Sequence, residues 1–237
     1  MRVLSRRPSP NLPAAVGAVQ GDIATGQGVS EAVRSVDVVA HCATNPTRKA
    51  RQTDVEGTRR LLEAARVVGT GHFLYISIVG IDRVPYPYYR VKLEAEGIIV
   101  AAGVPFTIFR ATQFHDLVLR FFGWSRRLPF IAVPRGFVFQ PVETAEVAGR
   151  MVDLVAAGPT GRAPDMGGPE VRRIEDLARS FARATGRSER VVSVTIPGKV
   201  GKGFRAGYHT CPEHADGRVT WEQFLEGRFG ERSESFS

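Results

Sequence analysis

Tyr88 and Lys92 are the two residues whose types and spacing most directly suggest chemistry in this sequence. They lie four positions apart in an expected helix, so their side chains share one helix face, with Cβ atoms roughly 5–6 Å apart. A free tyrosine, with a pKa of about 10, is a poor acid or base at neutral pH. A nearby ammonium favours the phenolate, lowers that pKa and allows the hydroxyl to exchange a proton with a carbonyl or an alcohol.

Ser77 is a candidate helper, because it closes the expected strand 72–77 that precedes this helix. Its hydroxyl would polarise the same carbonyl. A purely structural interpretation is the alternative: Tyr89 belongs to an apolar stripe beside the pair, and Lys92 with Glu96 would then form an exposed ion pair. Because such i, i+4 pairs arise often by chance on helices, spacing alone favours the structural interpretation.

Strands and helices alternate along the first half of the chain. The expected strands are 2–5, 18–22, 36–42, 72–77 and 105–110, and the expected helices are 29–36, 54–68 and 88–102. The near-continuous apolar character of residues 36–42 is typical of a buried parallel strand. This alternation predicts an α/β fold, with a Rossmann-like parallel sheet and helices on both faces.

The pattern loosens after residue 110. We expect helices at 114–122, 145–156, 175–185 and 220–228, strands within 131–140 and at 191–196, and loops at 158–169 and 198–203. One domain spanning residues 1–237 follows. Residues 1–112 would form its core sheet, and residues 113–237 its remaining sheet elements and a small C-terminal substrate lobe.

Composition limits the class of protein. The 237 residues are 43% hydrophobic and 24% charged, which is ordinary for a globular protein. The net charge of +8 is dispersed, so we expect no nucleic-acid partner. No apolar stretch reaches the roughly 18 residues of a membrane span, and two cysteines without a motif indicate a reducing compartment. We expect a cytoplasmic monomer or homodimer that acts on a small molecule.

Three stretches carry a recognisable pattern: GDIATGQGVSEAVRSVDVVAHCATNP, FLYISIVGIDRVPYPYYRVKLEAEGIIVAAGVPFTIFRATQF and GRVTWEQFLE. Together they resemble the NmrA-like, atypical branch of the short-chain dehydrogenase/reductase superfamily over nearly the whole chain. The resemblance implies NAD(P) binding and an oxidoreductase acting on a small carbonyl, quinone or enone. Tyr88 would be the acid/base, and Lys92 would tune it and hold the ribose. Some members resemble redox sensors that bind the cofactor without turnover, which is the alternative function.

The resemblance also implies cofactor contacts. Ser5, Arg6 and Arg7 end the first strand, where the adenosine ribose is expected, and arginines there suit the 2′-phosphate of NADP, although a basic surface turn before Pro8 is the alternative. Asp22 corresponds to an aspartate beside the adenine, although a turn aspartate is the alternative. The other implied contacts are Cys42, Ala43, Thr44, Ala111 and Thr112 beside the cofactor, and Gln113, Phe114 and His115 on the substrate side.

The glycine-rich phosphate loop of a Rossmann domain has no match in the sequence. The stretches that begin at Gly26 and Gly69 both lack the third glycine of G-x-G-x-x-G. We therefore expect an N-terminally shortened form of a family member, without its first strand and helix, roughly 30 residues. We expect impaired NADP(H) binding, and either a gap in the sheet or direct pairing of the strands that flank it. A misplaced start at Met1 would explain the shortening, and degeneration into a non-binding relative or a strand supplied by another chain are the alternatives.

Three potential metal ligands, His209, Cys211 and His214, lie close together near the C-terminus. Structural zinc sites normally use four ligands in recognisable spacings, which this cluster lacks. We therefore expect no metal. The sequence also has neither a G-x-S-x-G elbow nor a G-x-x-x-x-G-K-[ST] loop, so a hydrolase of the α/β type and a P-loop nucleotide hydrolase are not expected.

Overall fold

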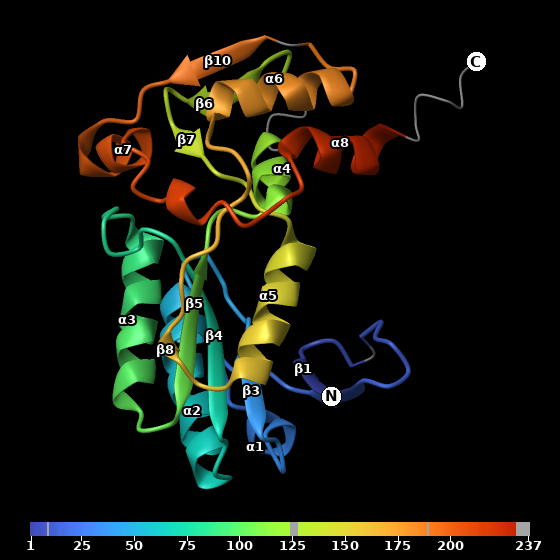
Figure 1. Ribbon diagram of the computed structural model, residues 1–237, viewed down its shortest axis with the longest axis vertical. Coiled ribbons are helices and arrows are strands. Elements are labelled where there is room, and N and C mark those ends of the chain that lie inside the picture. The colour runs from blue at the N-terminus through green and yellow to red at the C-terminus, as the bar shows by residue number, and fades with distance from the viewer. Residues whose placement is uncertain (9, 124–127, 189, 231–237) are drawn as a thin grey trace. The chain divides into compact units, whose positions relative to one another are not determined.

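The computed structural model describes residues 1–8, 10–123, 128–188 and 190–230 (Figure 1). The chain forms two compact units. The first unit comprises Met1–Ser77, Pro87–Phe109 and Met151–Ala163. The second unit comprises Ile78–Tyr86, Arg110–Arg150 and Pro164–Ser237.

The first unit is built on a four-stranded sheet. In sheet order its strands are β3 (Val38–His41), β4 (His72–Ile78), β5 (Phe106–Ala111) and β8 (Gly161–Arg162). β3 runs parallel to β4, and β5 runs parallel to β8. Phe73, Leu74 and Tyr75 of β4 are all buried, because both faces of a parallel sheet are covered. The expected Rossmann-like parallel α/β fold is confirmed.

Strands β1 (Arg2–Ser5) and β2 (Gly17–Gln20) form a separate parallel ladder in the same unit. Within the described residues, no ladder joins β1 to β3. β1 and β3 are the strands expected to flank the missing first strand of the sheet. Direct pairing between them, one of the two outcomes expected from the sequence, therefore does not occur.

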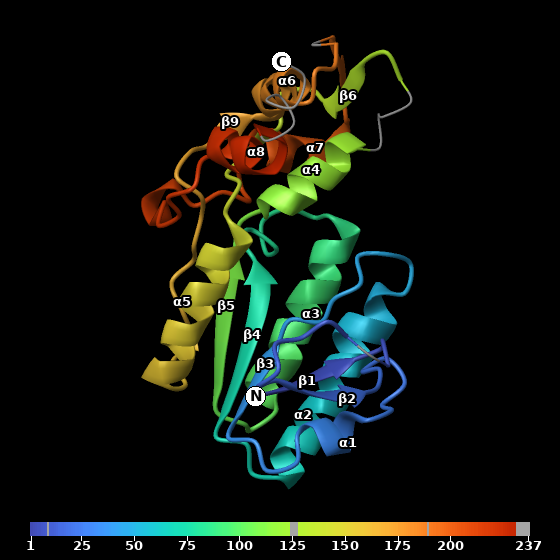
Figure 2. The ribbon, with the colours of Figure 1, turned by 90° about the vertical axis from the view of Figure 1, so that its right-hand side faces the viewer.

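Helices cover both faces of the larger sheet. On one face lie α2 (Thr58–Val67) and α3 (Pro87–Ala101), and on the other lie residues 151–157 of α5 (Thr144–Ala157) (Figure 2). The short helix α1 (Val29–Ala32) packs on α2. The core between sheet and helices includes Val39, Phe73, Tyr75, Leu61, Leu62, Ala65, Ala95 and Ile99. The core residues that belong to α2 and α3 recur at helical spacing, which is why both helices were predictable.

The turn before α2 differs from the prediction. Residues Arg51–Gly57 form a π-helix, η1, that runs directly into α2, where the sequence indicated an α-helix from residue 54. Hydrophobic periodicity cannot separate a single π turn from an α turn. Such turns are frequent at functional sites.

The second unit contains two small ladders. β6 (Ile131–Pro134) pairs in parallel with β10 (Val191–Val194), and β7 (Val138–Phe139) pairs antiparallel with β9 (Arg172–Arg173). The remaining elements are α4 (His115–Gly123), α6 (Ile174–Ala184), α7 (Gly198–Arg205), the 3₁₀ turn η2 (Pro212–His214) and α8 (Trp221–Phe229). Phe122, Ile131, Leu177, Phe181, Trp221 and Leu225 are among its core residues.

Two expected loops were wrong. Residues 158–169 contain the short strand β8, and residues 198–203 belong to helix α7. The glycines of α7 lower its helix propensity, but packing explains them. A Cβ on Gly201 would lie 1.9 Å from the carbonyl oxygen of Ile196, and a Cβ on Gly203 would lie 3.3 Å from Val84. Tertiary contact thus requires small residues in a segment that still forms a helix.

Candidate active site

Helix α3 carries the predicted pair. Pro87 begins the helix, where its missing N–H has no helical partner to lose. Lys92 is 3% exposed. Its Nζ donates to the carbonyl oxygen of Ile76 at 3.0 Å and lies 4.0 Å from the centre of the Tyr75 ring. The exposed-ion-pair interpretation of Lys92 is therefore wrong. The ammonium is buried against β4.

The charge state of Lys92 depends on its surroundings. Burial lowers its pKa to about 8, while the nearby negative charges of Asp54 and Glu96 oppose the shift. The Lys92 charge also acts on His41 of β3, whose pKa is lowered to about 3, first by burial and then by that charge. The neutral His41 ring forms a hydrogen bond to Thr58 at 2.8 Å.

Asp54 is the residue that sequence reasoning missed. It lies within the π-helix and is fully buried. Its Oδ1 accepts a hydrogen bond from the Thr44 hydroxyl at 2.5 Å, and its Oδ2 accepts one from the Asn45 N–H at 2.9 Å. The same Oδ1 lies 3.4 Å from the Tyr88 hydroxyl and 3.9 Å from Lys92 Nζ. One feature of the sequence could have indicated Asp54: it lies seven positions before Leu61, on the apolar face of the expected helix 54–68, where a charged residue is unusual.

Thr44 connects this carboxylate to Tyr88. The Thr44 and Tyr88 hydroxyls form a short hydrogen bond, and Thr44 lies in the exposed segment that follows β3, with Cys42 and Ala43. The structure thus brings together four groups from three elements: Tyr88 and Lys92 of α3, Asp54 of η1 and Thr44 after β3. We call these four residues the tyrosine cluster.

Ser77 lies on the face of β4 that also carries Tyr75, because side chains two positions apart in a strand point to the same side. Ser77 is 3% exposed, and its buried hydroxyl has no hydrogen-bond partner among the described residues. Buried hydroxyl groups are normally hydrogen-bonded. This one is therefore available to an incoming polar group.

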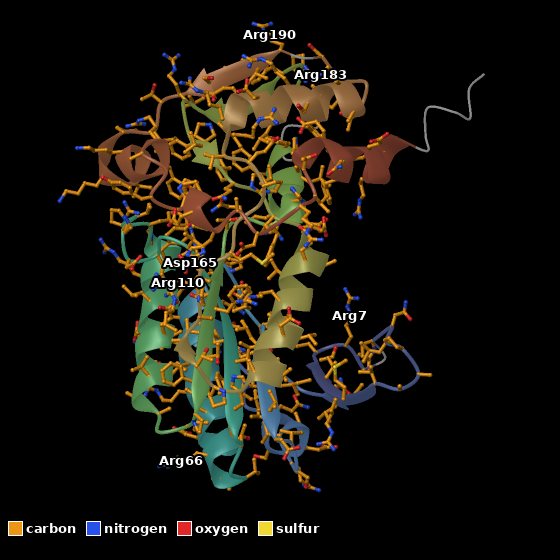
Figure 3. All side chains as sticks on the ribbon, in the orientation of Figure 1. Arg7, Arg66, Arg110, Asp165, Arg183 and Arg190 are labelled. Carbon is orange, nitrogen blue, oxygen red and sulfur yellow. The ribbon has the colours of Figure 1, made fainter. Side chains whose placement is uncertain are left out.

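The residues predicted for the adenosine end lie in the β1–β2 part of the first unit. The Ser5 hydroxyl accepts the Arg7 N–H at 3.1 Å. Arg6 and Arg7 are exposed, and the Arg7 side chain projects away from the ribbon (Figure 3). Asp22 Oδ1 accepts the Ala24 N–H at 2.8 Å, which is the turn-stabilising role given above as its alternative. Their cofactor roles stay predictions.

The residues predicted for the nicotinamide and substrate ends lie in the second unit. Ala111 is buried, and the Thr112 hydroxyl donates to the Gln140 carbonyl at 2.5 Å. The Gln113 amide donates to the His209 carbonyl at 3.1 Å. His115 is fully buried and stacks on Phe224, with ring centres 4.9 Å apart.

Phe114 lies directly before α4 and is half-buried. Within the second unit, Gln113 and His115 thus serve internal packing, and the predicted substrate roles of all three residues stay predictions.

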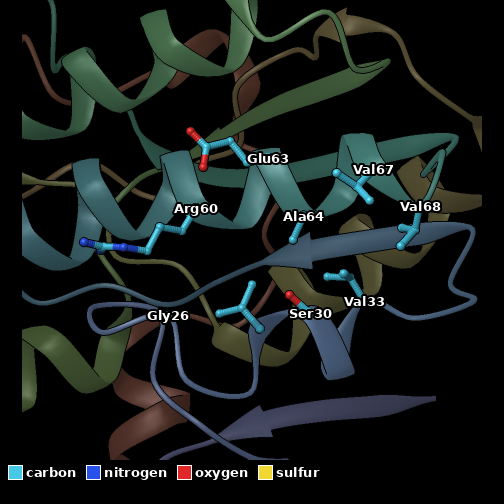
Figure 4. A pocket seen from close by; sticks show the side chains of 9 residues that line it. Gly26, Ser30, Val33, Arg60, Glu63, Ala64, Val67 and Val68 are labelled. Carbon is cyan, nitrogen blue, oxygen red and sulfur yellow. The ribbon is translucent and has the colours of Figure 1, made fainter.

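The first unit also has a groove that lies apart from the tyrosine cluster. It has a volume of about 360 Å³ between α1 and α2 and is lined by Gly26, Val29, Ser30, Val33, Arg60, Glu63, Ala64, Val67 and Val68 (Figure 4). None of these residues belongs to the tyrosine cluster, so the groove is not its substrate pocket.

The tyrosine cluster matches one end of a dinucleotide. The unpartnered Ser77 hydroxyl, the Tyr88 phenol and the exposed segment after β3 suit the polar groups of a nicotinamide. The 237 residues hold no G-x-G-x-x-G sequence for the pyrophosphate. The fit is therefore to the nicotinamide end.

The histidines near the C-terminus do not form a metal cluster within the described residues. His209 is fully buried beside the rings of Phe139 and Phe204. Across the residues that the structure describes, no three His, Cys, Asp or Glu side chains gather as a metal site would need. No helix in that part of the chain combines the length and apolar character needed to cross a membrane.

Solved structures share the fold. A quinone oxidoreductase from Escherichia coli, QOR2, solved with NADPH, has a TM-score of 0.75 at 14% identity, over 90% of this chain and 84% of its own. A short-chain dehydrogenase/reductase superfamily protein from Agrobacterium tumefaciens with bound NAD has a TM-score of 0.70 at 19% identity, over 98% of this chain and 89% of its own. At such identities the likeness shows the fold alone. None of the curated proteins matches the sequence.

A family model gives the sequence-level evidence. The model described as NAD(P)H-binding matches residues 2–120, which include β1 to β5 and the whole tyrosine cluster. This matched segment is half of the chain, and its fold is the one found in the solved structures. The chain therefore belongs to the NAD(P)H-binding family.

Proposed function

We propose that the chain is an NADPH-dependent oxidoreductase that reduces a small carbonyl, quinone or enone, with Tyr88 as the proton donor. The observation that supports this proposal is the tyrosine cluster itself. The Tyr88 phenol, the Lys92 ammonium and the buried Asp54 carboxylate lie together beside the exposed segment that follows β3. Ligands of open α/β sheets bind at the carboxyl ends of the strands.

The residues divide the chemistry between them. A reduced nicotinamide, when bound, supplies a hydride. Tyr88 gives its hydroxyl proton to the substrate oxygen, and the Lys92 charge stabilises the phenolate that is left. The Ser77 hydroxyl donates a hydrogen bond to the same oxygen and polarises the carbonyl.

The choice of cofactor rests on the basic residues after β1. Arg6 and Arg7 are exposed, and guanidinium groups suit a 2′-phosphate, so we propose NADP(H) over NAD(H). Because no glycine-rich loop is present to hold the pyrophosphate, we propose that binding is weaker than micromolar.

Calorimetric titration of the chain with NADPH and NADH, followed by turnover assays with carbonyls, quinones and enones, tests this function. We expect binding with NADPH preferred, and turnover of at least one substrate class. Tyr88→Phe should reduce turnover by roughly 10²–10⁴-fold and change NADPH affinity by only a few-fold. Tyr89→Phe, the same change one position along α3, is the matched control and should retain turnover.

Two results would overturn the oxidoreductase proposal. Binding without turnover, with an NADPH-dependent change in protease cleavage, would favour the sensor alternative. Full turnover in Tyr88→Phe would exclude the phenol as the proton donor.

A further inference from the structure

The tyrosine cluster has a fixed direction of hydrogen bonding. Both oxygens of the Asp54 carboxylate accept hydrogen bonds, from Thr44 and from the Asn45 N–H. An ionised carboxylate can only accept, so the single hydroxyl hydrogen of Thr44 is committed to Asp54. The Thr44 oxygen therefore serves as the acceptor in its hydrogen bond with Tyr88, and the Tyr88 hydroxyl also donates to Asp54 Oδ1 at 3.4 Å. Tyr88 must be the donor, which means that its phenol carries its proton.

We propose that Asp54 is a positioning residue that keeps Tyr88 protonated through Thr44, so that the phenol is held as a hydrogen-bond donor until a substrate oxygen takes its proton. This inference rests on the proposed function and adds a residue that positions the proton donor. A phenol held as a donor serves reduction, in which its O–H bond breaks and the proton passes to the substrate oxygen while a hydride reaches the substrate carbon.

The placement of Asp54 supports a role beyond packing. It is fully buried within a π-helix, and a buried carboxylate is costly unless it is paired and hydrogen-bonded. Its nearest cation is Lys92, at 3.9 Å. The fold thus retains a negative charge 3.4 Å from the Tyr88 hydroxyl, where it opposes formation of a phenolate.

Other ionisable groups surround the same space and must be considered. The groups that interact electrostatically with Lys92 or Tyr75 here are Asp54 of η1, Glu96 of α3, His41 of β3, Cys42 after β3 and Tyr88 itself. Asp54 differs from the others because it accepts a hydrogen bond from Thr44, which bonds directly to Tyr88.

Titration of Tyr88 in the cofactor-free chain tests the proposal. Tyrosine ring-carbon NMR shifts would be followed against pH, with Tyr88→Phe used to assign the resonance. Asp54→Asn removes the charge and allows the new amide to donate to Thr44, which frees the Thr44 hydrogen for the phenolate. We expect the Tyr88 midpoint to move to lower pH by about one unit or more.

Glu94→Gln is the matched control. Glu94 pairs with Arg51 at 2.5 Å and so links η1 to α3, the elements that carry Asp54 and Tyr88, but it lies outside the tyrosine cluster. This variant should leave the Tyr88 midpoint in place. An equal shift in Glu94→Gln would show that the midpoint reports the contact between the two elements, and would overturn the proposal.

Thr44→Val provides a second route if Asp54→Asn does not fold. This change exchanges the hydroxyl of the exposed Thr44 for a methyl group and cuts the hydrogen-bond connection between Asp54 and Tyr88, so the Tyr88 midpoint should move away from the native value, whereas Thr44→Ser should retain it. A folded Asp54→Asn or Thr44→Val with an unchanged midpoint would overturn the proposal. Absence of NADPH turnover would instead count against the proposed function, because this titration requires no cofactor.

Discussion

Lys92 and Asp54 form an ion pair that water scarcely reaches. Their side chains are 4% and 0% exposed, and the nitrogen–oxygen distance is 3.9 Å. Each charge compensates for the solvation that the other has lost. Removal of one partner leaves an uncompensated buried charge, and this is a larger penalty than the net value of the pair.

This asymmetry gives a prediction for stability. Lys92→Met should lower the free energy of unfolding by about 3–5 kcal/mol, as measured by urea denaturation. The double variant Lys92→Met/Asp54→Asn should recover much of that loss, because it buries no unpaired charge. Equal losses in the single and double variants would show that the packing of the Lys92 stem, and not its charge, is what stabilises the fold.

Helix α8 shows how local sequence determines an element. The Thr220 hydroxyl accepts the Gln223 N–H at 3.2 Å, and the Gln223 side chain accepts the Thr220 N–H at 2.9 Å. This reciprocal capping box satisfies two backbone donors that a helix otherwise leaves without partners. The next residue, Trp221, is buried and donates its indole N–H to the Leu177 carbonyl at 3.0 Å. The cap therefore sets the residue at which α8 begins and Trp221 enters the core.

Thr220→Ala should lower the free energy of unfolding by about 1 kcal/mol, because the Gln223 N–H loses its acceptor. Thermal unfolding followed by circular dichroism would measure the change. Thr220→Ser keeps the hydroxyl and should stay close to the native stability. A loss in Thr220→Ser as large as that in Thr220→Ala would mean that the methyl group, and not the cap, matters.

At the scale of the whole molecule, each unit buries a histidine in its neutral form. The pKa of His41 in the first unit is about 3, and that of His209 in the second unit is about 4, both lowered chiefly by burial. An unfolded histidine has a pKa of about 6.5. Between these values the unfolded chain binds more protons than the folded chain, so acid favours unfolding.

Stability should therefore be constant with respect to these histidines above a pH of about 6.5 and fall as the pH drops toward 4. Each histidine contributes up to about 1.4 kcal/mol per pH unit in that window. Urea denaturation at a series of pH values would measure the slope. His209→Leu should reduce the slope of stability against pH by the share of one proton, up to about 1.4 kcal/mol per pH unit. An unchanged slope would contradict the assignment of a neutral buried His209.

The sequence by itself determined the alternation of strands and helices in the first half of the chain. Hydrophobic periodicity is a local property, and residues such as Leu61, Leu62 and Ala65 repeat at the helical period whatever they pack against. It also placed Tyr88 and Lys92 on one face of α3, because four residues make about one helical turn. These features needed no knowledge of distant contacts.

Only the tertiary structure decided what surrounds that face. Asp54 precedes Tyr88 by 34 positions, and Thr44 precedes it by 44, so no local pattern connects them. Their meeting depends on the packing of η1 against α3 and on where β3 ends. The same is true of α7, whose glycines indicated a loop until their close contacts were known. Burial is a property of the folded chain. The sequence alone allowed Lys92 to be an exposed surface residue, and only the folded structure shows that it is buried and paired with Asp54.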